Sequence, residues 1–230
     1  MKIHPRLFAF LALSFVIATM VGTLSHELGH VAVAKVLGYD TQLHYASMDF
    51  NHDDKLLDYY EPHQKEIMIE GTPENLHFKK MLADSESDRH KVSWGGPVQT
   101  MLTGTIGFML LWFRRKKIAA YGMKFTDWLC VFLAFFWSRQ LANFILASIN
   151  YIVYSKPSVH GDEARLSLYY NLPWLTLNAV TATIAGILLI WVVFFIIPKL
   201  HRLTFIAAGI AGSALGYMIW MYWIGPVVLP

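Results

Sequence analysis

The strongest constraint on the fold of this chain is a set of long apolar stretches separated by polar segments. About 20 helical residues, at about 1.5 Å per residue, span the hydrocarbon core of a bilayer. The chain has 230 residues, of which 55% are hydrophobic and only 15% are charged, whereas soluble domains carry about 25% charged residues. We therefore predict an all-α polytopic membrane protein with about five transmembrane helices, within residues 7–37, 95–113, 125–154, 174–197 and 203–224.

The basic residues indicate how such a bundle would sit in its membrane. They flank the apolar stretches at Lys2, Arg6, 114–117, Lys199 and Arg202. By the positive-inside rule this pattern favours an N-terminus in the cytoplasm, and the opposite orientation is the alternative. We expect an integral multi-pass membrane protein, in a bacterial cytoplasmic membrane, whose environment is the lipid bilayer. The net charge of +3 is small and gives no reason to expect a nucleic-acid partner.

Two polar segments interrupt the apolar pattern of a chain that we treat as one membrane-embedded domain, residues 1–230. In the insert at 39–94, QLHYASMDF and EIMIEG alternate enough to predict short strands, as in β-hairpins, and GTPEN is typical of a turn. LADSESDRHK is interpreted as a solvated loop, and Gly95-Gly96-Pro97 is expected to open the second helix, because proline is tolerated in a first helical turn. The second polar break covers residues 155–173.

The first apolar stretch contains three side chains that are costly to bury in lipid, in the sequence SHELGH at residues 25–30. Residues four apart lie on one face of a helix, so His26 and His30 can bind one metal ion from adjacent turns. Glu27 can then reach a water on a zinc ion and take its proton. A chance match, or histidines satisfied by neighbouring helices, is the alternative. Ionisable groups inside a membrane helix are functional by default, which favours the zinc site.

A catalytic zinc ion usually has three protein ligands and one open position, so the two histidines need a partner. One group of candidates lies in the first insert and consists of Asp58, Glu61, Glu66 and Glu70. A second group lies in the second polar break and consists of His160, Asp162 and Glu163. The alternative role for Asp162 is to cap a short helix at Glu163–Asn171.

Two segments resemble the site-2 protease family of intramembrane zinc metalloproteases. SHELGHVAVAKVLGYD is similar to the HExxH helix of that family, and WGGPVQTMLTGTIGF is similar to its Gly-Pro segment. The resemblance implies a three-helix core, one zinc ion, Asp162 as third ligand, and Asn150 and Pro157 as the asparagine and proline that precede it. The resemblance is to a divergent branch, because the chain has His160-Gly161-Asp162 where the family has Leu-Asp-Gly, and Val-Gln-Thr after Gly-Pro instead of a small residue and asparagine. Asn150 also lies further from Asp162 than is usual in the family.

The third apolar stretch carries Arg139, Asn143 and Asn150, which fall within about 40° of one another on a helical wheel. In one interpretation this face lines the site, and Asn150 or Arg139 stabilises the oxyanion of the tetrahedral intermediate. In the other, Arg139 pairs with a carboxylate and the asparagines join helices together. In the last stretch, GIAGSALG at 209–216 is typical of a helix-packing surface.

The expected function is that of a zinc-dependent endopeptidase that cleaves transmembrane protein substrates, with Glu27 and Asn150 as catalytic residues and His26, His30 and Asp162 as metal ligands. The strands of the insert could offer an edge to an unwound substrate, by β-augmentation. The alternatives are a membrane metal-ion transporter, or an inactive relative that binds membrane proteins without cutting them. The intact Glu27 argues against an inactive relative.

Overall fold

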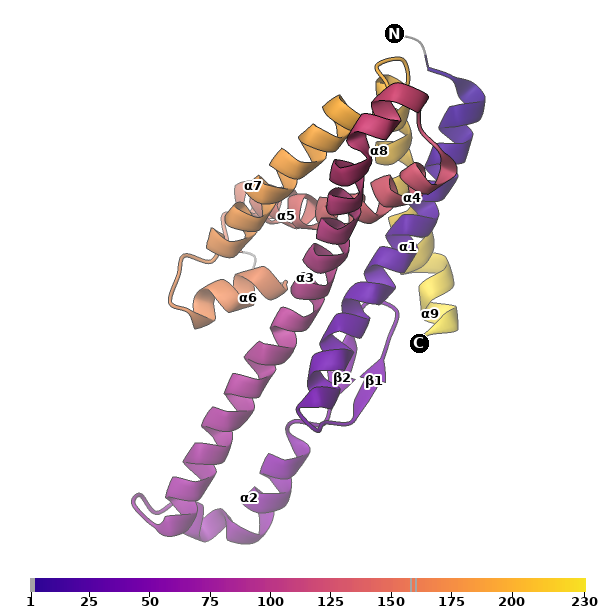
Figure 1. The fold of residues 1–230 in the computed structure, drawn as a ribbon. Coiled ribbons are helices and arrows are strands. Elements are labelled where there is room, and N and C mark those ends of the chain that lie inside the picture. Colours follow the sequence, from indigo (N-terminus) through magenta and orange to yellow (C-terminus); the bar gives the residue numbers. More distant parts are fainter. Residues whose placement is uncertain (1–2, 158, 160) are drawn as a thin grey trace.

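A computed structural model describes residues 3–157, 159 and 161–230, and helices make up nearly all of it (Figure 1). The prediction of an all-α architecture is confirmed, with one two-stranded sheet as the exception. The elements are α1 Pro5–Val36, β1 Thr41–Leu43, β2 Met48–Phe50, α2 Asp54–Ile67, α3 Pro73–Tyr121, α4 Phe125–Ala134, η1 Phe135–Trp137, α5 Ser138–Tyr154, α6 Asp162–Tyr169, α7 Thr176–Trp191, η2 Val192–Ile196, α8 Arg202–Ile219, η3 Trp220–Ile224 and α9 Gly225–Val228.

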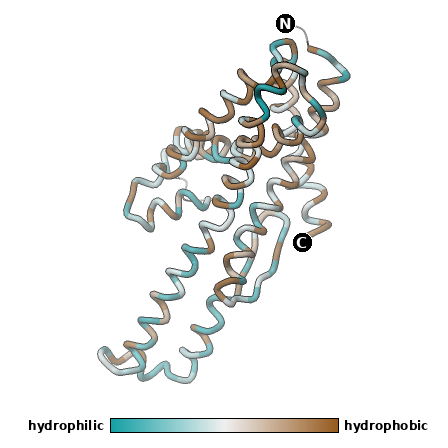
Figure 2. Tube along the Cα trace, in the orientation of Figure 1, coloured by the Kyte–Doolittle hydropathy of each residue, from teal (hydrophilic) through white to brown (hydrophobic). Residues whose placement is uncertain are grey.

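Among the described residues, four helical segments are long and apolar enough to cross a membrane: Pro5–Val36, Phe125–Tyr154, Thr176–Ile196 and Arg202–Val228. The fifth predicted span, 95–113, is helical as part of α3 but does not belong to this set. Its apolar residues alternate with glycine, threonine and Gln99, which lower its hydropathy. In Figure 2 hydrophobic residues gather in the bundle, whereas α2 and the first half of α3 form a hydrophilic hairpin that extends from it.

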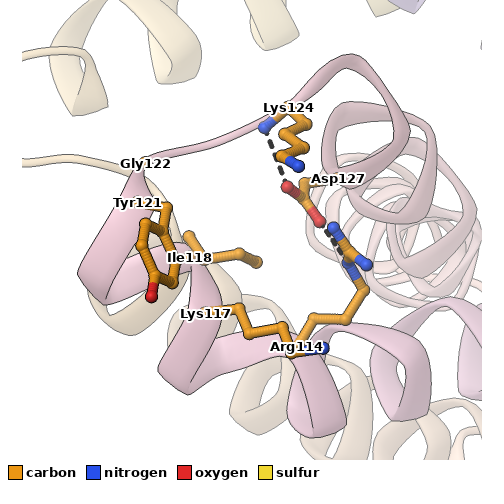
Figure 3. Close-up of a pocket in the computed structure, with 7 residues that line it drawn as sticks. All are labelled: Arg114, Lys117, Ile118, Tyr121, Gly122, Lys124 and Asp127. Atoms are coloured by element: carbon orange, nitrogen blue, oxygen red, sulfur yellow. Dashed lines mark hydrogen bonds and ion pairs between the residues drawn. The ribbon is translucent and has the colours of Figure 1, made fainter.

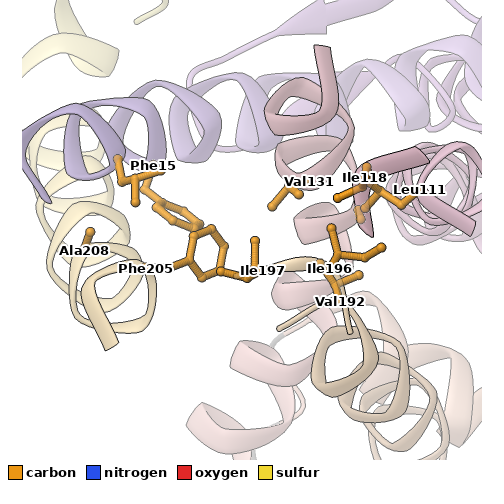
Figure 4. Packing of buried hydrophobic residues seen from close by; sticks show 11 residues of the cluster. Phe15, Leu111, Ile118, Val131, Val192, Ile196, Ile197, Phe205 and Ala208 are labelled. Atoms are coloured by element: carbon orange, nitrogen blue, oxygen red, sulfur yellow. The ribbon is translucent and has the colours of Figure 1, made fainter. Parts of the chain in front are cut away.

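The bundle is held together by a cluster of buried apolar side chains from α1, α3, α4, α8 and the α7–η2 segment (Figure 4). Phe15 of α1 packs edge-on against Phe205 of α8 within this cluster, with ring centroids 5.3 Å apart. The predicted packing surface GIAGSALG faces α1: a Cβ added to Gly212 would lie 2.4 Å from the carbonyl oxygen of Ala12. That prediction is confirmed, because small residues let the two backbones approach closely.

The longest element, α3, has 49 residues and so extends over about 70 Å. It begins at Pro73, where the Thr72 hydroxyl caps it by accepting a hydrogen bond from the Asn75 backbone N–H at 3.2 Å. Two predictions are therefore wrong: LADSESDRHK is helical instead of a loop, and Gly95-Gly96-Pro97 lies inside the helix instead of opening it. The polar composition indicated solvation, which an exposed helix satisfies as well as a loop.

Of the two strand predictions for the insert, one is confirmed and one is wrong. QLHYASMDF forms β1 and β2, an antiparallel pair with Gln42 opposite Asp49, as predicted. EIMIEG is wrong as a strand, because it forms the last turn of α2 and the turn that follows. The β1–β2 loop is tied to the C-terminal segment, since the Trp220 Nε1–H donates to the Tyr45 carbonyl at 2.7 Å. The hairpin packs against α1, which carries the candidate site.

Candidate metal centre

The candidate metal centre lies where α1, α3 and α6 meet, and three predicted ligands converge there. His26 and His30 stand on adjacent turns of α1, with their Nε2 atoms 3.3 Å apart. Asp162, the first residue of α6, places its Oδ2 atom 3.1 Å from Nε2 of His26 and 3.2 Å from Nε2 of His30. Both histidines are buried. These are the ligand atoms of a group able to hold a metal ion.

Partners on α3 determine which nitrogen each imidazole presents to Asp162. Nδ1 of His30 lies 2.7 Å from the Val92 carbonyl oxygen, and Nδ1 of His26 lies 2.9 Å from the Thr100 hydroxyl. A carbonyl can only accept, so we assign the His30 proton to Nδ1. The backbone N–H of Gly96 is also near this nitrogen, but at 3.3 Å it is the longer contact. With the proton on Nδ1, a neutral histidine directs the lone pair of Nε2 towards the aspartate.

This arrangement fits a zinc ion in both charge and size. Two imidazole lone pairs and a carboxylate oxygen face one another at 3.1–3.3 Å, and three acceptors this close need a proton or a cation between them. Ligands at about 2.0–2.1 Å around a tetrahedral ion lie about 3.3 Å from each other. Two histidines and one carboxylate, each histidine oriented by a second partner, form a set typical of catalytic zinc.

The close packing of α3 on α1 depends on glycine at three positions. A Cβ added to Gly96 would lie 2.4 Å from Nε2 of His30 and 2.5 Å from Nε2 of His26, inside the site itself. Gly29 and Gly95 face each other, and a Cβ on Gly29 would lie 2.5 Å from the Gly95 carbonyl oxygen. The Gly-Gly-Pro segment therefore gives the two imidazoles room beside α3.

Asp162 reaches the histidines because α6 is held against α3. The His90 and Tyr169 rings stack with centroids 3.5 Å apart, and the Trp94 Nε1–H donates to the Tyr170 hydroxyl at 3.3 Å. Gly161, at φ 123°, supplies the backbone turn before α6 and is its N-cap. Asp162 is the first residue inside α6 and Gly161 is the N-cap, so the interpretation of Asp162 as the cap is wrong.

The charge on Asp162 also suits a cation. Burial raises the pKa of this carboxyl, but its close contacts with His26 and His30 outweigh burial and hold the pKa well below its usual range. For the neighbouring Glu163, burial raises the pKa. Its Oε2 atom accepts a 3.5 Å hydrogen bond from Nδ2 of Asn143 on α5. Asn143 therefore joins α5 to α6, as one of the two interpretations predicted.

Glu27 is buried beside the ligands and faces α5 instead of joining them. It is only 6% exposed, and its Oε1 atom lies 3.9 Å from Nη2 of Arg139. Arg139 thus pairs with a carboxylate, and that carboxylate is the predicted base itself. The Nε atom of Arg139 is buried without a hydrogen-bond partner among the described residues.

The other predicted residues lie elsewhere. The carboxylates of the first insert are exposed on α2 or just beyond it and contribute nothing to the cluster: Asp58, Glu61, Glu66 and Glu70. Asn150 and Pro157 are exposed, and among the described residues Asn150 has no side-chain hydrogen bond. His160 lies outside the described residues. The sequence does not point to Thr100 or to the Val92 carbonyl, because a threonine and a backbone oxygen in a long helix carry no signal that they orient a histidine ring.

The role of Thr100 leads to a prediction. In Thr100→Val the Nδ1–H of His26 loses its acceptor in a buried place, so His26 is less firmly oriented. We expect zinc affinity to fall by about 10–100-fold, as measured by competition with a chromophoric chelator. Thr183→Val on α7 is the control, because that hydroxyl is exposed and bonds only to the Ala179 carbonyl. Equal affinities in the two variants would show that Thr100 does not orient His26.

Comparison of the chain with family models, with curated proteins and with solved structures finds no match.

Proposed function

We propose that this chain is a zinc-dependent intramembrane endopeptidase, which hydrolyses peptide bonds of membrane-spanning substrates with an activated water. The observation that carries the proposal is the convergence of His26, His30 and Asp162 within 3.1–3.3 Å, with Glu27 buried next to them. A resemblance to site-2 proteases in the HExxH helix and the Gly-Pro segment supports it.

The residues have separate roles in the proposed reaction. A zinc ion held by His26, His30 and Asp162 would supply Lewis acidity that brings the pKa of a water towards about 7. Glu27 takes the proton of this water and passes it to the leaving amine. Arg139, 3.9 Å from Glu27, helps to orient the carboxylate. The Thr100 hydroxyl and the Val92 carbonyl keep both imidazoles turned towards the ion.

The proposed setting is a bacterial cytoplasmic membrane, crossed by the four apolar segments and by residues 95–113 of α3 as a fifth span. His26, Glu27 and His30 lie within the candidate span Pro5–Val36. A substrate peptide bond in a helix is shielded by its own hydrogen bonds, so the substrate must unwind before it is cut. The β1–β2 hairpin packs on α1, and we propose that its free edge receives the unwound segment by β-augmentation.

A metal-ion transporter is the second candidate, and one observation counts against it. Zinc transporters usually carry metal ligands on a second membrane helix, whereas His26, His30 and Asp162 form the one cluster of this kind among the described residues. An inactive relative is disfavoured by Glu27, which is retained and buried at the site.

Reconstitution in liposomes tests the proposal. The purified protein is mixed with a single-span substrate and assayed for cleavage, while a zinc-sensitive dye inside the vesicles reports metal flux. We expect cleavage that stops when a chelator removes zinc and resumes when zinc is restored, with no flux above empty liposomes. Zinc flux without cleavage of any of a panel of single-span substrates would establish the transporter instead.

The predicted role of Asn150 in the oxyanion site can be tested in the same assay. Asn150 is exposed on α5 and is therefore available to a substrate that docks on this face. If it stabilises the oxyanion, Asn150→Ala lowers kcat by about 100-fold with unchanged zinc content. Asn143→Ala is the contrast, because loss of its contact with Glu163 should loosen α6 and lower zinc occupancy. A normal kcat in Asn150→Ala would show that Asn150 is not a catalytic residue.

A further inference from the structure

The end of the molecule that carries the N-terminus is strongly basic. The start of α1, the α3–α4 connection and the α7–α8 turn meet there (Figure 1), and the His4 N–H donates to the Thr204 hydroxyl at 3.2 Å across two of them. Residues 3–8, 112–128 and 194–204 contain eight basic side chains and a single acidic one, Asp127. Such a surface attracts the anionic headgroups of a membrane.

A pocket of about 400 Å³ lies in this basic end, between the last turns of α3 and the segment that leads into α4 (Figure 3). Arg114, Lys117 and Tyr121 line it from one face of α3, at positions i, i+3 and i+7. Lys124 and Asp127 line it from the opposite side. The pocket therefore brings three basic side chains together around a cavity that Ile118 and Tyr121 also line.

The one acidic group in the pocket is already neutralised. Asp127 is buried, and its Oδ1 atom accepts a 2.5 Å hydrogen bond from Nε of Arg114. Its Oδ2 atom accepts a 2.8 Å hydrogen bond from the Lys124 backbone N–H. The ammonium groups of Lys117 and Lys124 make no ion pair among the described residues. The pocket therefore keeps an uncompensated charge from two lysines, which are exposed and free to bind an anion.

We propose that this pocket binds the phosphate group of an anionic phospholipid. The lysines would bind the phosphate oxygens, while Ile118 and Tyr121 would contact the glycerol and the upper acyl chain. Tyrosine and tryptophan favour the depth of the headgroups, and Trp112 and Tyr121 flank the basic residues at that depth. Basic pockets between membrane helices are suited to anionic headgroups. The inference rests on membrane embedding and is independent of hydrolysis at the zinc site.

A second pocket on the other face of α3 has similar residues but is less suited to the same ligand. It is lined by Trp112, Arg115 and Lys116 from α3, and by Trp191 and Phe195. The Arg115 guanidinium lies over the Trp112 ring, 3.8 Å from its centroid, and donates to the Trp112 carbonyl at 2.7 Å. This arginine is already engaged, so Lys116 of the second pocket is one of the nearby charges suited to a control.

The test uses the full-length protein in a neutral detergent, titrated with dioctanoyl phosphatidylglycerol, dioctanoyl phosphatidylcholine or inorganic phosphate. Binding is measured by native mass spectrometry and by the shift in Tm. We expect saturable binding of phosphatidylglycerol, with an affinity about tenfold or more lower in Lys117→Gln/Lys124→Gln. The reason is that each lysine near a membrane surface raises the affinity for anionic lipid severalfold. Lys116→Gln/Lys199→Gln removes the same charge from exposed positions at the same end and should bind normally.

The outcomes separate the possible ligands. Selective loss of phosphatidylglycerol binding in Lys117→Gln/Lys124→Gln supports a lipid site. Equal saturation by inorganic phosphate, lost in the same variant, supports the phosphate site and identifies the source as the free anion. Equal weakening in both double variants, or equal binding of phosphatidylcholine, overturns the proposal, because either result would reflect general surface charge or acyl chains. All four lysines are exposed, so gel filtration should show every variant folded.

Discussion

Glu27→Gln is expected to keep the fold and the bound zinc but to lose proteolysis by a factor of about 10²–10⁴, the usual contribution of a general base. Glutamine has the shape of glutamate and preserves a polar contact with Arg139, 3.9 Å away. It cannot take a proton from water. The measurements are zinc stoichiometry by elemental analysis and initial rates of cleavage with a single-span substrate in liposomes.

A matched control for Glu27→Gln is Glu163→Gln, which makes the same change at another buried carboxylate near the site. Glu163 contacts Asn143 and no predicted metal ligand, so its rate should remain within a few-fold of the parent. Full activity in Glu27→Gln would show that another group takes the proton. Loss of zinc in Glu27→Gln would instead assign Glu27 a role in holding the metal.

Asp162→Asn is expected to lose most of the bound zinc, and with it all measurable cleavage. The neutral amide is a poor zinc ligand. The two imidazoles of His26 and His30 alone would leave the ion with two of its usual three protein ligands. We expect zinc content to fall from about one ion per chain towards zero after dialysis against a weak chelator, and added zinc to restore activity poorly.

Glu163→Gln again serves as the control for Asp162→Asn, because it alters the next residue of α6 without touching either histidine. Circular dichroism and the elution volume should match the parent in both variants, since Asp162 is at the helix start and makes no capping hydrogen bond. Full zinc occupancy in Asp162→Asn, with loss in Glu163→Gln, would move the third ligand to Glu163. It would also require α6 to rotate from its observed position.

Sequence alone was sufficient for features that depend on local spacing and composition. The four-residue spacing of His26 and His30 places them on one helix face, because the α-helix repeats every 3.6 residues. The lengths of the apolar stretches indicated the four helical segments that are long and apolar enough to cross a membrane. The small residues at 209–216 indicated the close packing of α8 on α1. Each of these features depends on the spacing or composition of residues within one helix, so it can be predicted from the sequence.

Tertiary structure decided what depends on residues far apart in the chain. Several carboxylates were possible third ligands, and only the docking of α6 on α3, through Tyr169 and Tyr170, brings Asp162 to the two histidines. It also decided that residues 73–121 form one continuous helix, whose Thr100 and Val92 orient the imidazoles. Polar residues are compatible with a loop and with a solvated helix alike. Contacts between distant segments depend on how the helices pack, and the spacing of residues along the chain does not predict that packing.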